Sequence, residues 1–379
     1  MVDTVHTSVS GNVAPDLSLI VCTLNEGAAI RSVIEEITAT LAGINHEIIV
    51  VDDNSQDNTQ SEVLDVAKTH PHVRLHVRVN ERGLSSAAIK GWDIAQGRYL
   101  GVMDGDGQHD PQAILALAQM IMKGDKDLVC VSRYLGKSET GLSWFRDMGS
   151  KAATTVTGWV LHAPLTDPLS GCFMMTRDYY MSARPKLTGV GFKILVDVVG
   201  SSRIHPRFGE VKASLRQRQG GVSKLDIRVV LDLGALLVEK ATGGVLKARF
   251  VLFAGVGLSG VFVSALILTL FRVMGGSSLA EFSLAQIVAI AVAMTWNFFI
   301  NNTVTFRDKR LKGMGLIIGL LGFYLACLPG AILNWWIGIL LKQAHVEFIL
   351  AGVIPAFLIG LINFWFSKML SWRDKKSGK

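Results

Sequence analysis

Two aspartates and a glutamine lie on one short loop of this chain. Asp104 and Asp106 are separated by a single glycine, and Gln108 follows after another glycine. Carboxylate and carboxamide oxygens are the ligands preferred by a Mg²⁺ or Mn²⁺ ion that takes phosphate oxygens in its other positions. A polar turn is the simpler alternative, because Asp110 before Pro111 would cap a following helix in any case. The spacing indicates a divalent metal site made of Asp104, Asp106 and Gln108.

Apolar strands alternate with amphipathic helices around this loop. The predicted strands are 17–24, 46–53, 73–79 and 99–103, and the helices between them begin near residues 26, 58 and 85, with another helix over about 111–123. This order predicts an α/β fold with a mostly parallel, doubly wound sheet, in which ligands bind beyond the carboxyl ends of the strands. Acidic or amide side chains follow three strands, at 25–26, 52–59 and 104–108. Because carboxylates packed together need a cation or a donor-rich ligand, the three loops predict one shared binding site.

Four segments carry a resemblance to a known family. The sequence has neither a Gly-x-Gly-x-x-Gly after the first strand nor a P-loop, which disfavours a dinucleotide fold and a P-loop enzyme. Residues 19–26, 51–59, 80–85 and 104–111 instead resemble, in order and spacing, the family-two glycosyltransferases of GT-A (Rossmann-like) fold, and more narrowly the polyprenyl-phosphate (dolichol-phosphate) mannose or glucose synthases. The resemblance extends over residues 17–230. It departs at 22–26, where Cys-Thr-Leu-Asn-Glu replaces the family's Pro-Thr-Tyr-Asn-Glu and the donor-base pocket lacks a proline and an aromatic ring.

The resemblance implies a role for each site residue. The implied catalytic residues are Asp104, Asp106 and Arg133. Asp106 and Gln108 would be direct metal ligands, with Asp104 on the ribose or in the outer shell of the metal. The residues implied for the nucleotide sugar are Thr23, Asn25, Glu26, Asp53, Ser55, Gly83, Leu84, Asp104, Arg218 and Lys224, of which Asp53 would accept from the base and the last two lie on a loop that closes over the donor. The residues implied for the acceptor phosphate are Arg133, Arg146, Ser150 and Lys151, and the segment 167–171 would lie near them.

Solvated surface cations are the alternative for these basic residues. A second phosphate group beside a metal-diphosphate site nevertheless requires groups of this kind, namely an arginine fork, a hydroxyl and lysines.

The composition changes beyond Lys247. The apolar segments 250–271, 284–306, 316–341 and 348–370 are each long enough to cross a hydrocarbon core about 30 Å thick. Basic residues gather before the first segment, between the second and third, and after the fourth. The positive-inside rule therefore places the N-terminal domain in the cytoplasm, next to a multi-pass domain in the cell membrane. The formal net charge of +7 is explained by these clusters, so nucleic acid need not be invoked.

A repeat lies within the apolar half. The motif at 297–307 returns at 363–373, and both copies end the second segment of a pair, which predicts four transmembrane helices in two hairpins. We expect Asn297 and Asn363 to hydrogen-bond across helices, because an unpaired amide in a membrane is costly. A conduit for lipid phosphate is a sharper interpretation of the same asparagines. This half resembles the small four-span GtrA-like domain of bacterial polyprenyl-phosphate glycosyl-transfer proteins.

The sequence thus divides into five parts. We expect a disordered tail over 1–16, a GT-A catalytic domain over 17–225, an amphipathic juxtamembrane helix and linker over 226–247, a GtrA-like domain over 248–372, and a basic cytoplasmic tail over 373–379. The four cysteines have no paired spacing and are expected to be buried, reduced thiols without metal.

The expected activity is the inverting, metal-dependent transfer of one hexose, mannose above others, from a nucleoside diphosphate sugar (GDP-mannose is favoured) to a polyprenyl or dolichyl monophosphate at the cytoplasmic membrane face. A phosphate monoester with a second pKa of about 6 is already anionic at neutral pH, so the chemistry needs no separate base. Three alternatives stay open. They are a glucosyl- or N-acetylhexosaminyltransferase using a UDP-sugar, a processive synthase, whose usual Gln-x-x-Arg-Trp is absent here, and a non-enzymatic flippase or scaffold. The expected partners are the two substrates and the lipid bilayer, and no oligomeric state is predicted.

Overall fold

The computed structural model describes residues 5–6, 14–79, 81–135, 155, 157–158, 160–161, 164–189, 191, 193–213, 216, 227–306 and 309–370. The chain divides into two compact units, Met1–Gly244 and Val245–Lys379.

The first unit is built on an eight-stranded sheet in the order β1-β4-β3-β2-β5-β7-β6-β8. Its strands are β1 (Val5–His6), β2 (Leu17–Thr23), β3 (His46–Asp52), β4 (Val73–Val77), β5 (Tyr99–Asp104), β6 (Leu128–Ser132), β7 (Phe173–Thr176) and β8 (Phe208–Lys212). The described helices are α1 (Ile30–Thr40), α2 (Thr59–Thr69), α3 (Leu84–Ile94), α4 (Pro111–Met122), α6 (Arg177–Ala183), α7 (Ile194–Ser201) and α8 (Ile227–Ala241), with a short 3-10 turn at Arg184–Lys186.

The doubly wound parallel arrangement is confirmed for β2, β3, β4 and β5, which pair in parallel. The rest of the sheet is mixed. β7 lies between β5 and β6 and is antiparallel to both, whereas β6 and β8 are parallel to each other. The sheet is therefore less uniformly parallel than the alternation of the first half predicted.

Part of the N-terminal tail joins the sheet. Val5 pairs with His76 and His6 with Leu75, so that β1 lies antiparallel to β4. The expectation that residues 1–16 are disordered therefore does not hold for Val5 and His6, whose backbone groups extend the ladder at this edge.

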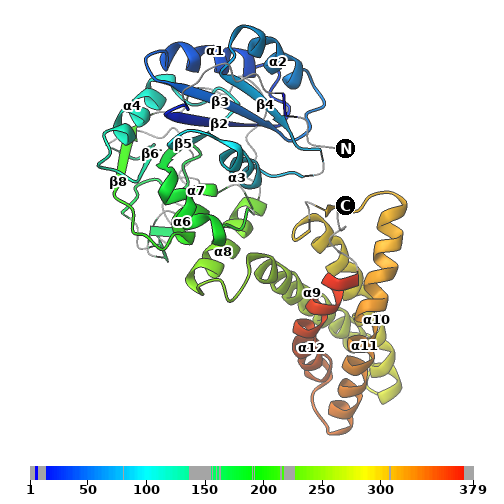
Figure 1. Ribbon diagram of the computed structural model, residues 1–379. Helices are drawn as coiled ribbons and strands as arrows, with labels where there is room; N and C mark the ends of the chain where they lie inside the picture. The colour runs from blue at the N-terminus through cyan, green and yellow to red at the C-terminus, as the bar shows by residue number, and fades with distance from the viewer. Residues whose placement is uncertain are drawn as a thin grey trace. The chain divides into compact units, whose positions relative to one another are not determined.

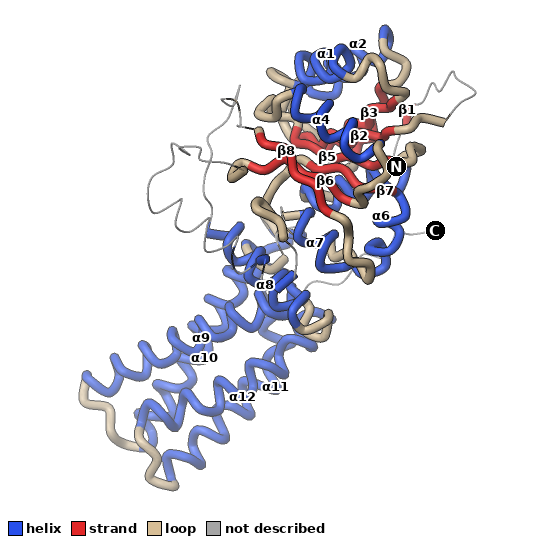
Figure 2. Tube along the Cα trace, turned by 90° about the vertical axis from the view of Figure 1, so that its left-hand side faces the viewer, coloured by secondary structure: helices blue, strands red, loops and turns tan. Residues whose placement is uncertain are grey.

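Helices cover both faces of this sheet (Figure 1). Because successive side chains of a strand point to opposite faces, Val21 belongs to the core cluster that includes residues of α1, α2 and α4, whereas Ile20 belongs to the cluster that includes residues of α3, α6 and α7. All seven residues of β2 are buried, and five of them are apolar, as suits a strand covered on both faces. Figure 2 shows the strands edge to edge between the two helical layers.

Helix α8 lies where an amphipathic helix was expected before the membrane segments. Its Leu233, Leu236 and Leu237 are buried against Val196 of α7, whereas Val230 and Leu231 are exposed. The leucine face of α8 is thus already covered by the first unit.

The second unit consists of α9 (Ala248–Val273), α10 (Leu279–Thr303), α11 (Met314–Gln343) and α12 (Phe348–Leu370). Along the chain, each helix packs on the next, and α12 packs on α9 to close the bundle. α9, α10 and α11 are each long and apolar enough to cross a membrane, as judged by length and composition among the described residues. The fourth span stays a prediction, because only the backbone of α12 is described beyond Ile359.

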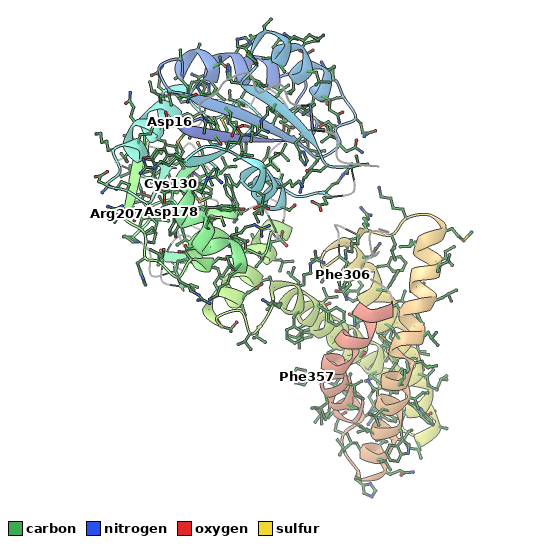
Figure 3. All side chains as sticks on the ribbon, viewed as in Figure 1. Asp16, Cys130, Asp178, Arg207, Phe306 and Phe357 are labelled. Carbon is green, nitrogen blue, oxygen red and sulfur yellow. The ribbon has the colours of Figure 1, made fainter. Side chains whose placement is uncertain are left out.

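Large apolar side chains cover the outside of this second unit. Phe262 is 76% exposed and Phe357, labelled in Figure 3, is 51% exposed, whereas Phe306 is buried. Apolar exposure on this scale is unfavourable in water and suits helices surrounded by hydrocarbon. The four cysteines are buried free thiols, as expected.

Candidate active site

The loops after β2 and β3 are hydrogen-bonded to each other. The backbone N–H of Asn25 donates to Ser55 Oγ at 2.8 Å, and Asn25 Oδ1 accepts from Gln56 N at 2.9 Å. The backbone N–H of Glu26 donates to Thr59 Oγ1 at 2.9 Å. Asn25 has a φ of 58°, which asparagine tolerates better than most residues. Asn25, Glu26 and Ser55, which were predicted to bind the nucleotide sugar, therefore lie close together. The side chains of Asn25 and Ser55 hold the two loops to each other.

Asp52 is the buried centre of this edge. Thr23 Oγ1 donates to Asp52 Oδ1 at 3.0 Å, Ser55 Oγ donates to the same oxygen, and Gln60 Nε2 donates to Oδ2 at 2.9 Å. The carboxylate has no solvent exposure. Thr23 and Ser55 therefore have a structural partner in Asp52, in addition to the donor role predicted for them.

Asp53 is held by a buried cation that sequence reasoning missed. Arg78 Nε donates to Asp53 Oδ1 at 2.7 Å, and Arg78 Nη2 donates to the same oxygen. The backbone N–H of Gly83 donates to Asp53 Oδ2 at 2.7 Å, and Arg78 Nη2 also reaches Gly83 O at 3.0 Å. Arg78 and Asp53 are 2% and 5% exposed. Burial raises the pKa of Asp53, while Gly83 N–H and Arg78 oppose the rise.

This network fixes the turn that leads into α3. Gly83 has a φ of +134°, a conformation that L side chains rarely adopt, and Leu84 begins the helix directly after it. The missed signal is the position of Arg78 in the predicted strand 73–79, where valine or leucine alternates with arginine or histidine and a buried arginine requires a carboxylate. Asp53 is thus already engaged by Arg78 and Gly83, and its predicted contact with a base would have to use its remaining lone pairs.

The loop after β5 carries the predicted metal ligands. Asp106 is 3% exposed, and its Oδ1 accepts from Gln108 N at 3.1 Å. Asp104 ends β5 with a side chain that is 37% exposed. Arg216 N donates to Gln108 O at 2.9 Å, and Gln108 Nε2 donates to Arg216 O at 3.4 Å. These two hydrogen bonds join Arg216 to the loop after β5.

The donor set of this loop fits a cation shared with a substrate. Within the described ranges, no group of three His, Cys, Asp or Glu side chains is placed to hold a metal. Asp104 accepts no hydrogen bond from any described residue, and its Oδ2 lies 3.9 Å from His109 Nε2. Two carboxylates and an amide suit Mg²⁺ or Mn²⁺ when a diphosphate supplies further oxygens. In chemical type, Asp104, Asp106 and Gln108 fit part of such a ligand set.

A glycine is packed against Asp104. A Cβ on Gly171 would lie 3.0 Å from Asp104 Oδ2 and 3.9 Å from His109 Nε2. The segment 167–171, which the family resemblance placed near the acceptor, therefore contacts the carboxylate that ends β5.

Positive charge lies next to this segment. Arg133 Nε donates to Asp167 Oδ2 at 2.7 Å, and Arg133 Nη2 donates to Asp167 Oδ1 at 3.0 Å. Asp167 is fully buried, whereas the Arg133 side chain is 33% exposed. The hydrogen bonds to Asp167 raise the pKa of Arg133. Asp167 thus orients the guanidinium and leaves part of it open to a ligand.

Lys193, directly before α7, is a second cation here and was missed by sequence reasoning. Its Nζ donates to Leu169 O at 3.5 Å, and it forms no ion pair within 4.0 Å among the residues whose side chains are described. Burial lowers the pKa of Lys193, as does the charge of Arg133, while Asp104 and Asp167 oppose the shift. The available signal is a lysine within the segment 192–199, in which Lys193 and Asp197 are charged and the other residues are apolar.

The remaining predicted site residues lie outside the described residues. They are Arg146, Ser150, Lys151, Arg218 and Lys224.

Comparison with known proteins places this geometry in context. The chain matches the family Glycosyl transferase family 2 over residues 18–182 and the family GtrA/DPMS, transmembrane domain, over residues 252–372. The dolichol-phosphate mannosyltransferase of Pyrococcus furiosus is 31% identical over 360 residues, which cover 94% of this chain and 99% of that protein. The dolichol-phosphate mannosyltransferase of Mycosarcoma maydis is 34% identical over 236 residues, or 59% of this chain and 79% of that protein.

A solved structure is similar to the chain in part. Glucosyl-3-phosphoglycerate synthase from Mycobacterium tuberculosis, in complex with Mn²⁺, uridine diphosphate and phosphoglyceric acid, superposes with a TM-score of 0.46 at 21% identity. The match covers 60% of this chain and 78% of that chain.

Proposed function

Because this chain belongs to the dolichol-phosphate mannosyltransferase family and is a glycosyltransferase with a membrane domain, we propose that it transfers one hexose from a nucleoside diphosphate sugar to a polyprenyl or dolichyl monophosphate. Mannose from GDP-mannose is the favoured donor, because both relatives named above are mannosyltransferases. A UDP-sugar is the alternative donor, since the segment 22–26 lacks the family's proline and aromatic residue.

The observation that carries the proposal is the meeting of opposite charges around the segment 167–171. Gly171 contacts the carboxylate of Asp104, and Asp167 binds the guanidinium of Arg133 in the same segment. A transfer between two phosphate-bearing substrates needs both kinds of group side by side. The acidic side suits a cation on the donor diphosphate, and the basic side suits the acceptor phosphate.

The proposed chemistry uses the acceptor as its own nucleophile. Arg133 and Lys193 hold the acceptor phosphate, with Arg146, Ser150 and Lys151 as further predicted contacts. An oxygen of this dianionic phosphate attacks the anomeric carbon while the bond from that carbon to the diphosphate oxygen breaks, so the configuration inverts. No proton has to be removed from the nucleophile, because the phosphate monoester is mostly ionised at neutral pH.

The leaving group carries the charge that the protein must balance. A divalent cation held by Asp106 and Gln108, with Asp104 in its outer shell or on the ribose, would supply that neutralisation when bound. Asp106 is positioned for this by the N–H of Gln108. Arg218 and Lys224 are proposed to close over the donor from the loop that begins at Arg216. The catalytic unit is proposed to face the cytoplasm, where the basic clusters beside the spans would also lie.

A donor panel tests this proposal. The purified full-length protein in lipid is incubated with radiolabelled GDP-mannose, UDP-glucose or UDP-N-acetylglucosamine and with dolichyl or undecaprenyl phosphate, and the lipid is then extracted. We expect label in the lipid fraction, with GDP-mannose as the most efficient donor. A preference for a UDP-sugar would show that the donor is the UDP-sugar and not GDP-mannose. Absence of label in the lipid fraction with every donor would contradict the proposed transfer.

Substitution of Gly171 by alanine should disturb Asp104 without unfolding the protein. The added Cβ would lie 3.0 Å from Asp104 Oδ2, which is closer than an ordinary contact, so the carboxylate must move by a few tenths of an ångström. We expect kcat to fall about tenfold, since catalytic groups tolerate little displacement. Gly43→Ala is the matched control, because nothing lies within 4 Å of a Cβ at that position. Equal kcat values for the two variants would show that the placement of Asp104 does not limit the reaction.

A further inference from the structure

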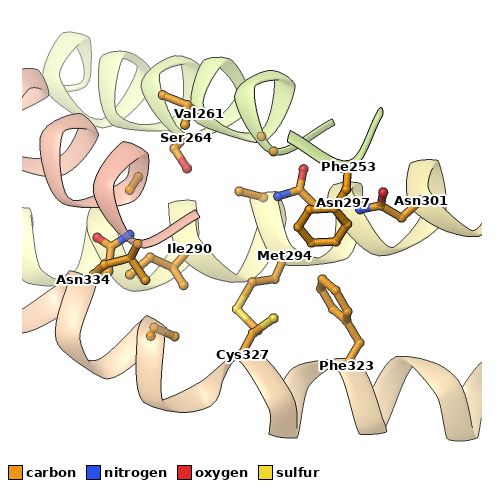
Figure 4. A pocket seen from close by; sticks show the side chains of 17 residues that line it. Phe253, Val261, Ser264, Ile290, Met294, Asn297, Asn301, Phe323, Cys327 and Asn334 are labelled. Atoms are coloured by element: carbon orange, nitrogen blue, oxygen red, sulfur yellow. The ribbon is translucent and has the colours of Figure 1, made fainter. Parts of the chain in front are cut away.

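A cavity of about 80 Å³ lies among the helices of the second unit (Figure 4). All four helices contribute to its lining, and three of the lining residues are asparagines. Asn297 and Asn301 come from α10 and Asn334 from α11, and they are joined by Ser264 of α9 and Cys327 of α11. The rest of the lining is glycine and apolar side chains. The cavity is therefore a polar site within an apolar bundle.

Glycine creates the space beside one asparagine. A Cβ on Gly260 would lie 2.4 Å from Asn297 Oδ1 and 2.5 Å from its Nδ2, so no larger residue fits there without moving the amide. Gly257 and Gly330 also line the cavity. The absence of side chains at these positions leaves the amide of Asn297 facing open volume.

Two buried polar atoms at this cavity lack partners. Asn297 Oδ1 and Asn301 Nδ2 have no hydrogen-bond partner among the described residues. Asn301 is 1% exposed, and its own Oδ1 already accepts from Thr305 Oγ1 at 2.7 Å. An unpaired amide group in hydrocarbon is costly, because no solvent is there to satisfy it. The site thus presents one unpaired acceptor and one unpaired donor.

The lining carries no charge to receive an anion. None of the described residues around the cavity is Lys, Arg, His, Asp or Glu. Binding of a phosphate away from water requires cationic donors such as an arginine fork. A lipid phosphate in this cavity would have amide donors only, and its charge would stay uncompensated.

We propose that this cavity is a hydration site, in which ordered water molecules link Asn297 to Asn301, and that it does not receive the lipid phosphate. Water can donate to Asn297 Oδ1 and accept from Asn301 Nδ2, which satisfies both unpaired atoms. A cavity needs a volume of about 10–15 Å³ to hold one water molecule, so the 80 Å³ of this cavity accommodates a small cluster of water molecules. For Asn297, this proposal replaces the interpretation as a phosphate conduit by a neutral, hydrogen-bonding role, whereas the side chain of Asn363 lies outside the described residues.

The substitution Asn297→Leu distinguishes a hydrated cavity from a dry one, because it changes the apparent Tm in opposite directions in the two cases. Leucine has the same branching as asparagine but no polar atoms. In a dry cavity the substitution removes an unpaired buried amide and should raise the apparent Tm of the full-length protein in detergent. In a hydrated cavity it removes the partner of the bound water, and we expect the apparent Tm to fall by a few degrees.

Asn302→Leu gives the scale for this measurement. Asn302 donates to Leu311 O at 3.2 Å and accepts from Leu311 N at 2.8 Å, so its loss lowers the Tm whether the cavity is wet or dry. A lower Tm for Asn297→Leu than for the wild type, as for Asn302→Leu, supports the proposal. An unchanged or raised Tm for Asn297→Leu overturns it.

A structure of the full chain in a lipid nanodisc, at a resolution that shows ordered waters, provides a second measurement. We expect density within hydrogen-bond distance of Asn297 Oδ1 and Asn301 Nδ2, unchanged when a short-chain polyprenyl phosphate is added. An empty cavity overturns the hydration site. Phosphate density in the cavity after the lipid is added overturns the exclusion of phosphate, independently of whether the catalytic unit transfers sugar.

Discussion

Replacement of Asp106 by asparagine is expected to lower kcat by at least about a hundredfold while the protein stays folded. Asp106 is 3% exposed on the loop after β5 and is oriented by the N–H of Gln108. The substitution keeps the shape of the side chain and removes the charge that would neutralise a cation on the donor diphosphate. Loss of such stabilisation costs about 3 kcal/mol or more in the barrier, which corresponds to about two orders of magnitude in rate. The rate of sugar transfer at saturating substrate and the apparent Tm together measure this effect.

Asp125→Asn is the control for a carboxylate outside the site. Its side chain is 62% exposed and lies 3.9 Å from Lys126 Nζ. We expect its kcat to match the wild type. Normal turnover of Asp106→Asn, or full wild-type activity in excess EDTA, would contradict the metal role of this loop.

Arg78→Met should strongly destabilise the first unit. Arg78 and Asp53 form a buried ion pair, so removal of the guanidinium leaves the Asp53 carboxylate buried with Gly83 N–H as its remaining donor in the described network. Breaking a buried pair on one side typically costs about 3–5 kcal/mol. The apparent free energy of unfolding in urea, monitored by hydrogen exchange of the backbone amides of α3, measures this loss of stability. Because the carbonyl oxygen of Gly83 loses its hydrogen bond from Arg78 Nη2, we also expect the KM for the nucleotide sugar to rise.

Arg31→Met is the matched control for an exposed arginine. Arg31 pairs with Glu62 at 2.6 Å and with Asp65 at 3.6 Å, and its side chain is 43% exposed. Exposed pairs contribute about 1 kcal/mol or less. If Arg78→Met were no more destabilising than Arg31→Met, the Asp53–Arg78 pair would not be the element that holds the donor loops.

The elements that could be predicted are those with a strong local pattern. β2 to β5 were predicted within one or two residues, because β2, β3 and β5 are mostly apolar and β4 alternates apolar residues with Arg or His, each between polar turns. α1 begins at Ile30, later than expected, since residues 27–29 form a turn in which Gly27 N donates to Asp57 Oδ2 at 3.0 Å. β7 and β8 were not predicted. They have four and five residues, and β7 is inserted between β5 and β6, a pairing that no local pattern specifies.

The site follows the same division. Asp104, Asp106 and Gln108 could be proposed from the sequence because their spacing is local, and their position at the end of β5 and on the following loop follows from the sheet. Arg78 and Lys193 were missed, since their importance depends on contacts across the fold. The requirement for glycine at position 171 was also missed, because it depends on the close approach of Asp104 in the fold. A sequence pattern identifies acidic loops, whereas the cations that balance them are identified by burial and distance.

The most direct test of the central claim is mass spectrometry of the lipid product formed by the purified full-length protein. Parallel reactions contain the preferred nucleotide sugar and a short-chain polyprenol, its monophosphate or its diphosphate. The account predicts that the monophosphate alone gains mass, and that it gains one hexose, because the attacking group is an ionised phosphate monoester held by Arg133 and Lys193. A product from the polyprenol, or a ladder of several hexoses on one carrier, would contradict single transfer to a lipid phosphate.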